Sequence, residues 1–148
     1  MQKNLLTSLF LILFSVSTNA YSLESSYLTE GIKHFNNKEF DKSKIFFERD
    51  LVFNPKSEKS YLYLAKIFLE KENKEEEEVN LKNVLLLNPK NEEAIYMLAI
   101  IKIEQFDYNE AKSLLNQFNL VCKSFCKKKD EIQSKFKKLS PKDEKSKN

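Results

Sequence analysis

The two cysteines are the residues whose type and spacing best suit covalent chemistry. Cys122 and Cys126 are the only cysteines among 148 residues and lie four positions apart. The spacing differs from the C-x-x-C of thiol oxidoreductases, and no second cysteine pair completes a zinc site. Residues four apart in a helix have Cα atoms about 6 Å apart, within the range for a disulfide. We predict a short disulfide between two helices, with free thiols and redox catalysis as the alternatives.

The histidine and the acidic run are weaker candidates for catalysis. His34 is the one histidine, and we interpret it as a packing residue instead of a base or a metal ligand. The four residues Glu75 to Glu78 follow one another around a helix instead of converging, which indicates a solvated face whose mutual repulsion costs some helix stability. The sequence contains no glycine-rich phosphate loop and no nucleophile elbow. It therefore predicts no enzyme activity, cofactor, metal or small-molecule substrate.

The composition indicates that these residues stand on helices. The chain has one glycine, three prolines and no tryptophan, so it lacks the turn residues of a sheet protein with tight hairpins. Abundant lysine, glutamate and leucine favour long helices. The sequence therefore predicts an all-α protein.

The chain repeats itself with a period of 34 residues. Asn54-Pro55 and Asn88-Pro89 each end an apolar stretch, and proline disfavours helix at the residue before it. Small residues recur in the same register, as do large apolar ones: Gly31, Ala65 and Ala99; Phe47, Leu81 and Leu115; Tyr27, Tyr61 and Ile95. A small residue in a first helix lets a second helix pack closely against it.

These residues resemble the tetratricopeptide repeat, a 34-residue helix-turn-helix unit. The matching positions are Phe40, Ser43, Phe47 and Pro55; Tyr61, Leu64, Ala65, Phe68, Leu81 and Pro89; and Leu98, Ala99, Tyr108, Ala111 and Leu115. The resemblance implies a right-handed superhelix (α-solenoid) of about three repeats in residues 21–121, namely 24–57, 58–91 and 92–121. The chain departs from the family pattern at the turn glycines, replaced by Lys38, Glu72 and Phe106, and at Asp50, Glu77 and Lys123.

The period predicts three helix pairs, at 24–36 and 40–53, 58–71 and 74–87, and 92–104 and 108–119. An apolar stripe from Phe125 to Leu139 predicts a seventh helix at 124–139, inside a capping segment 122–140. Solenoids commonly end in such a helix because the last repeat leaves an apolar face open. The lysines of this segment are interpreted as its solvated face.

The resemblance also implies a groove, lined by the first helix of each repeat, that binds extended or helical peptides. The groove positions are Leu28, Ile32, Phe35, Lys59, Leu62, Lys66, Leu69, Glu70, Glu93, Tyr96, Ile100, Ile103 and Glu104. Most of these are apolar, which disfavours the family's clamp for a C-terminal carboxylate. We expect a scaffold that binds a peptide or helical segment of a partner protein. The alternatives are a homo-oligomer that assembles through the groove and a groove filled by the capping helix.

The two ends of the chain carry further predictions. Lys3, the apolar stretch 5–16 and the small residue Ala20 have the order of a secretory signal peptide, residues 1–20, cleaved after Ala20. An uncleaved membrane anchor is the alternative. We expect export to a bacterial periplasm and protein partners in the cell envelope. The basic residues of the chain are lysines apart from Arg49, and the C-terminal part lacks the aromatic interleaving that single-stranded nucleic acid needs, which argues against nucleic acid. The charged segment 141–148 is expected to be disordered.

Overall fold

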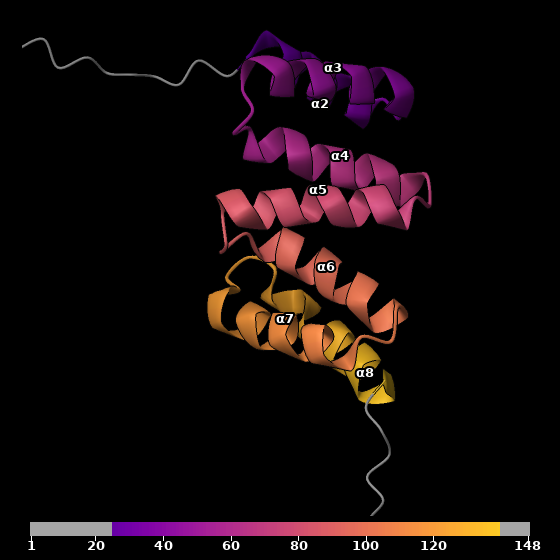
Figure 1. The fold of residues 1–148 in the computed structure, drawn as a ribbon, viewed down its shortest axis with the longest axis vertical. Coiled ribbons are helices and arrows are strands. Elements are labelled where there is room, and N and C mark those ends of the chain that lie inside the picture. Colours follow the sequence, from indigo (N-terminus) through magenta and orange to yellow (C-terminus); the bar gives the residue numbers. More distant parts are fainter. Residues whose placement is uncertain (1–24, 140–148) are drawn as a thin grey trace, which may run out of the picture.

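The computed structural model describes residues 25–139 and consists of helices (Figure 1). The described helices are α2 (Ser26–Asn36), α3 (Phe40–Phe53), α4 (Glu58–Glu70), α5 (Lys74–Leu87), α6 (Glu92–Glu104), α7 (Tyr108–Val121), the short 3-10 helix η1 (Cys126–Lys128) and α8 (Lys129–Leu139). The predicted signal peptide and the segment 141–148 lie outside the described residues, so those predictions stand as they were.

The helices pack in consecutive pairs, α2 with α3, α4 with α5 and α6 with α7, and the pairs stack along the long axis of the molecule (Figure 1). The first helix of each pair has a side-chain N-cap: Ser25, Ser57 and Asn91 each accept a hydrogen bond from a backbone N–H of the first turn. The six paired helices agree with their predicted limits to within two residues.

Three residues between paired helices have a left-handed backbone. Lys38, Glu72 and Phe106 have φ values of 60°, 54° and 60°. They are the positions where the repeat family has glycine, the residue that adopts this conformation without steric cost. The missing glycines therefore leave the turn geometry unchanged but place side chains in a strained conformation.

The recurring small residue explains the close packing of the first pair. Gly31 lies against Phe47, whose side chain is fully buried. A Cβ atom at position 31 would stand 2.6 Å from Phe47 Cε1. The corresponding residues of the next repeats, Ala65 and Ala99, are also fully buried. The interpretation of these positions as a close helix contact is confirmed.

Asp50, which replaces a small residue, joins the first two repeats. It is fully buried and accepts hydrogen bonds from the hydroxyl groups of Ser25 and Ser60. Burial alone would raise its pKa, but hydrogen bonds from Ser25, Ser57 and Ser60 outweigh it and lower the pKa of Asp50 below its usual value. The network thus holds the start of α2, the end of α3 and the start of α4 together.

The capping helix is shorter than predicted. Instead of one helix from residue 124, the chain leaves α7 at Cys122 in an extended conformation, passes through η1 and begins α8 at Lys129. The carboxylate of Glu92 accepts hydrogen bonds from the backbone N–H groups of Lys123, Ser124 and Phe125. These bonds hold an irregular loop where the prediction had a helix, because they satisfy the loop's amides without helical turns.

The two cysteines close this loop. The Sγ atoms of Cys122 and Cys126 lie at bonding distance, 2.11 Å, with Cα atoms 5.1 Å apart. The location between α7 and the capping segment agrees with the prediction. The assumed helical geometry was wrong, because the first cysteine is extended and the second begins η1.

Candidate functional site

The structure divides the predicted groove into a closed part and an open part. In the first repeat, Leu28 is only 6% exposed and belongs to the core, while Ile32 and Phe35 pack on that core. The ring of Phe35 stands edge-on to those of Phe40 and Tyr63, at 5.6 and 5.1 Å between centroids. The first repeat therefore offers little open apolar surface.

The middle of the predicted groove is occupied by the chain's own side chains. Lys66 forms an ion pair with Glu93 at 2.9 Å and lies 5.1 Å from the ring centroid of Tyr63. Leu62 packs against the core and is half-buried, whereas Glu70 is exposed. The central cation is thus already neutralised, which leaves it poorly suited to hold a partner's carboxylate.

The capping segment covers the start of the third repeat's groove face. The hydroxyl of Tyr96 donates a hydrogen bond to Glu131 at 2.8 Å, and Lys128 lies 5.6 Å from the Tyr96 ring centroid. The ring also contacts Phe125, and Ile132 of α8 is fully buried. The capping segment therefore fills the groove at Tyr96, in line with the alternative of a groove filled by the capping helix. The later part of α6 is left open by α8.

The open part consists of two pockets on either side of the C-terminal half of α6. Both are lined by Ile100 and Glu104. We call the first the basic pocket: it has a volume of about 220 Å³, and its other lining residues are Ile103, Phe106, Lys135 and Lys138. We call the second the acidic pocket: it has a volume of about 420 Å³, and its other lining residues are Leu69, Glu72, Lys74, Glu77 and Ile101.

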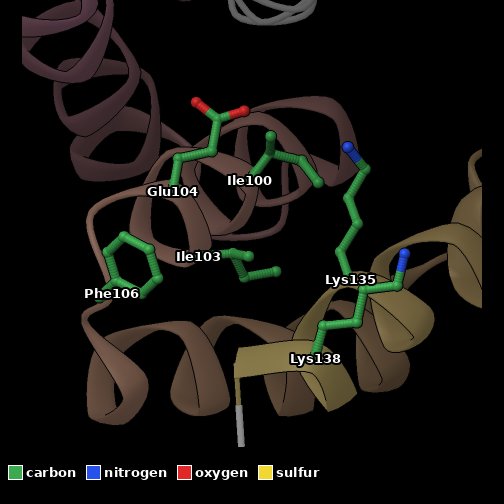
Figure 2. Close-up of a pocket in the computed structure, with 6 residues that line it drawn as sticks. All are labelled: Ile100, Ile103, Glu104, Phe106, Lys135 and Lys138. Carbon is green, nitrogen blue, oxygen red and sulfur yellow. The ribbon is translucent and has the colours of Figure 1, made fainter.

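The basic pocket has an apolar floor and cationic walls. Figure 2 shows Ile103 at its centre, Phe106 on one side and the lysines of α8 on the other, with Glu104 at the edge. Phe106 is 81% exposed although its backbone is left-handed. The left-handed backbone belongs to the turn that Phe106 shares with Lys38 and Glu72, whereas the exposed ring adds apolar surface at the edge of the pocket.

The acidic pocket contains a buried carboxyl group. Glu77 is 3% exposed, so the prediction of a solvated face was wrong for this residue. Burial, and then the negative charge of Glu104, raise the pKa of Glu77 to about 7, while Lys74 opposes the shift. Lys74 itself forms an ion pair with Glu104.

The next residue of the acidic run has a different partner. Glu78 forms ion pairs with Lys82 and with the buried Lys102, both at 2.6 Å. Burial alone would raise the pKa of Glu78, but hydrogen bonds from Lys102, Lys82 and Gln105 lower it to about 2. Only Glu75 and Glu76 of the run are exposed as predicted. Glu78 therefore holds α5 to α6 and leaves Glu77 as the carboxyl group without such partners.

The residues that sequence reasoning missed had signals in the repeat register. Glu77 stands 34 residues from Ser43 and from Ala111, both fully buried, so its burial followed from the period. Lys135 and Lys138 are exposed, as expected of a solvated face, and they also line the basic pocket because α8 lies beside α6.

A second exposed apolar set lies on the other helices of the repeats. Val52, Leu86 and Leu120 are 34 residues apart and are 76%, 80% and 87% exposed. We call them the outer ladder. These positions serve as controls for the pockets: they test whether changing any exposed apolar residue has the same effect as changing a pocket residue.

The remaining candidates for chemistry have structural surroundings. The ring of His34 stacks on Phe46 at 5.1 Å and its Nδ1 contacts Glu39, so His34 packs as predicted. Among residues 25–139, no group of three or more His, Cys, Asp or Glu side chains could hold a metal ion. None of the helices in the same range is long and apolar enough to span a bilayer.

Solved structures agree with the repeat architecture, whereas the sequence comparisons found no match. No protein-family model and no curated protein matches the sequence. The fold resembles that of a chain in the CopN-Scc3 complex, with a TM-score of 0.64 and 18% identity over 82% of this chain and 78% of that one. It also resembles the Sgt2 TPR domain from Aspergillus fumigatus, with a TM-score of 0.63 and 15% identity over 82% of this chain and 87% of that one. The fold is tetratricopeptide-like. At these identities the likeness establishes the arrangement of helices alone.

Proposed function

We propose that this protein binds a segment of a partner protein where the acidic and basic pockets meet. We call this surface the α6 groove, formed by Leu69, Ile100, Ile103, Glu104 and Phe106. The observation that carries the proposal is the pair of adjoining pockets with an apolar floor that no described residue covers. Leu69 is 51% and Phe106 81% exposed, and they flank Ile100 and Ile103 in the two adjoining pockets, so the apolar surface is contiguous, as at interaction sites.

The shape of the α6 groove favours a peptide segment over a small molecule. Small-molecule sites are enclosed and bury most of their ligand, whereas two shallow pockets in a row suit successive side chains of one chain. An amphipathic helix or an extended segment places apolar side chains at such intervals. The charged rims on both sides, acidic at one end and basic at the other, then select the segment by charge.

The place of action is part of the proposal. The order of residues 1–20 supports export, and a disulfide between Cys122 and Cys126 suits an oxidising compartment. We propose a scaffold of the cell envelope in a bacterial periplasm. Mass spectrometry of the protein from its host tests this: a mature chain beginning at Tyr21 is expected, and an intact N-terminus in the soluble fraction would contradict export.

Self-association is the second candidate, because the outer ladder gives a second apolar surface that another copy could contact. It predicts a molar mass in solution that rises with concentration. A Leu86→Asp variant would then lower that mass. A monomer at all accessible concentrations removes this candidate.

The test of the proposed function is crosslinking capture in the host cell with matched variants. Leu69→Asp and Phe106→Asp change exposed side chains of the α6 groove, and Leu86→Asp changes an equally exposed side chain of the outer ladder. We expect the wild type and Leu86→Asp to capture the same few proteins and both groove variants to lose them. Equal capture by all four proteins would refute binding in the α6 groove.

A further inference from the structure

The acidic pocket holds a carboxyl group that the rest of the described chain leaves without a partner. Glu77 is 3% exposed, yet it accepts no hydrogen bond and forms no ion pair with residues 25–139. Only the more distant charge of Lys74 favours its ionised form, and that ammonium group is engaged by Glu104. A buried carboxylate without a partner is destabilising, so a small side chain, as in the other two repeats, would stabilise the fold more.

The surroundings of Glu77 specify the chemistry of a missing partner. The pocket is lined by three carboxylates, Glu72, Glu77 and Glu104, and by one ammonium group, that of Lys74. Negative charge is therefore in excess, and a cation is the complementary ligand. A metal ion is not indicated, because no described group of three such side chains could hold one. The remaining lining, Leu69, Ile100 and Ile101, suits the methylene groups of an organic cation.

We propose that the acidic pocket receives a lysine or arginine side chain of the partner segment, with Glu77 as its buried carboxylate partner. This inference rests on the proposed function and adds the chemical identity of the anchoring residue. The methylene groups of the cation lie along Leu69 and Ile100, and its charged end reaches Glu77. The volume of about 420 Å³ is sufficient for either side chain.

The basic pocket gives the bound segment a direction. Lys135 and Lys138 line it from α8 (Figure 2). Neither forms a salt bridge within residues 25–139, and the charge of Lys135 also acts on Glu131 of the same helix. A segment anchored by its cation in the acidic pocket would place the next part of its chain over Ile100 and Ile103. An acidic residue beyond that point faces the two lysines. The reversed segment would put like charges together at both ends, which opposes binding.

The test uses Nα-acetyl-lysine N-methylamide as the probe and the norleucine analogue, which lacks the charge, as its control. The protein is the chain from residue 21 onward, labelled with ¹³C at glutamate carboxyl carbons. We expect the lysine probe to shift the Glu77 carboxyl signal saturably, with a dissociation constant of roughly millimolar order for so small a fragment. The pKa of Glu77 should fall by at least one unit at saturation, because a bound cation favours the carboxylate.

The control variants separate this inference from the proposed function. Glu77→Gln should abolish the saturable shift of the remaining pocket signals, whereas Phe106→Asp, outside the acidic pocket, should retain it and lose partner capture. No saturable shift, or an equal shift with the norleucine analogue, would overturn the inference even if partners are captured. A saturable shift without any captured partner would refute the proposed function and leave the cation site standing.

One further outcome concerns the chain's own lysines beyond residue 139. If removal of residues 140–148 tightened probe binding more than tenfold, a lysine of that segment would be the occupant. That result would overturn a partner cation as the ligand. We expect the affinity of the probe to be unchanged by the removal.

Discussion

The contact between Gly31 and Phe47 gives a prediction that can be worked through quantitatively. An alanine at position 31 would place its Cβ at 2.6, 2.8 and 3.0 Å from three ring carbons of Phe47. Such short contacts require the ring or the helix to move. The ring is fully buried between α2, α3 and α4, so movement displaces other core side chains.

The expected free energies follow from two opposing effects. Alanine gains about 1 kcal/mol over glycine in helix propensity, whereas forcing extra volume into a packed core costs about 1–3 kcal/mol. We expect Gly31→Ala to lower the free energy of unfolding by about 1–2 kcal/mol, since two of the contacts are shorter than real Cβ atoms show and the third is tight. Phe47→Leu alone leaves a cavity and should cost about 1–2 kcal/mol. The double variant recreates the alanine and leucine of the other repeats. It should lose less free energy of unfolding than the sum of the two single changes.

The measurement is urea unfolding followed by circular dichroism at 222 nm, for the wild type, both single variants and the double variant. A coupling free energy of at least about 1 kcal/mol in favour of the double variant is expected for side chains in contact. Comparable slopes of the unfolding free energy against urea serve as the control that the folded states remain compact. Additivity of the two single changes within about 0.5 kcal/mol would refute the claim that the missing Cβ makes room for the ring.

Three further predictions concern the turns and the capping loop. Lys38→Gly should raise the free energy of unfolding by about 0.5–1 kcal/mol because glycine relieves the strain of a left-handed backbone. Asn37→Gly, one residue earlier and with a negative φ, should lower that free energy. Equal effects of the two changes would contradict the claim that Lys38 is strained. Glu92→Gln should cost about 1–2 kcal/mol at pH 7 by weakening its bonds to three backbone amides, discounted for partial exposure. These amides hold the pKa of Glu92 at about 2, so the free energy of unfolding that Glu92→Gln loses should be full above pH 4.5 and should vanish as the pH falls towards 2. An unchanged loss at pH 2 would contradict the lowered pKa. Cys126→Ser should cost about 2 kcal/mol by opening the short loop, and the difference from wild type should disappear in reductant. Equal stability of the two proteins without reductant would contradict the disulfide.

The fold could be predicted from the sequence because the 34-residue period fixes both the helices and their partners. Asn54-Pro55 and Asn88-Pro89 mark helix ends by backbone chemistry, so the ends needed no knowledge of the third dimension. The capping helix had no such signal. Its apolar spacing was compatible with one long helix, and the competing bonds from Glu92 come from a residue more than 30 positions earlier.

The candidate site was predicted only in outline. The family register placed Ile100, Ile103 and Glu104 on the groove face, and the structure gives each of them a pocket. The family register could not show that Leu28 is buried in the core, or that Glu131 and Phe125 cover Tyr96. Those contacts depend on how deeply the helices pack. Charge alone also misjudged Glu77, since a carboxylate's position in a run says little about its burial.

The most direct test of the α6 groove places a photocrosslinker at two exposed positions in the living host cell. Phe106 is replaced by p-benzoylphenylalanine, a close relative of its own side chain, and Leu86 of the outer ladder is replaced likewise in a matched strain. If the partner lies in the α6 groove, light should attach one defined protein at position 106 and none of it at position 86. Attachment of the same protein at position 86 alone, or only of a second copy of the chain at position 106, would contradict the proposed binding surface.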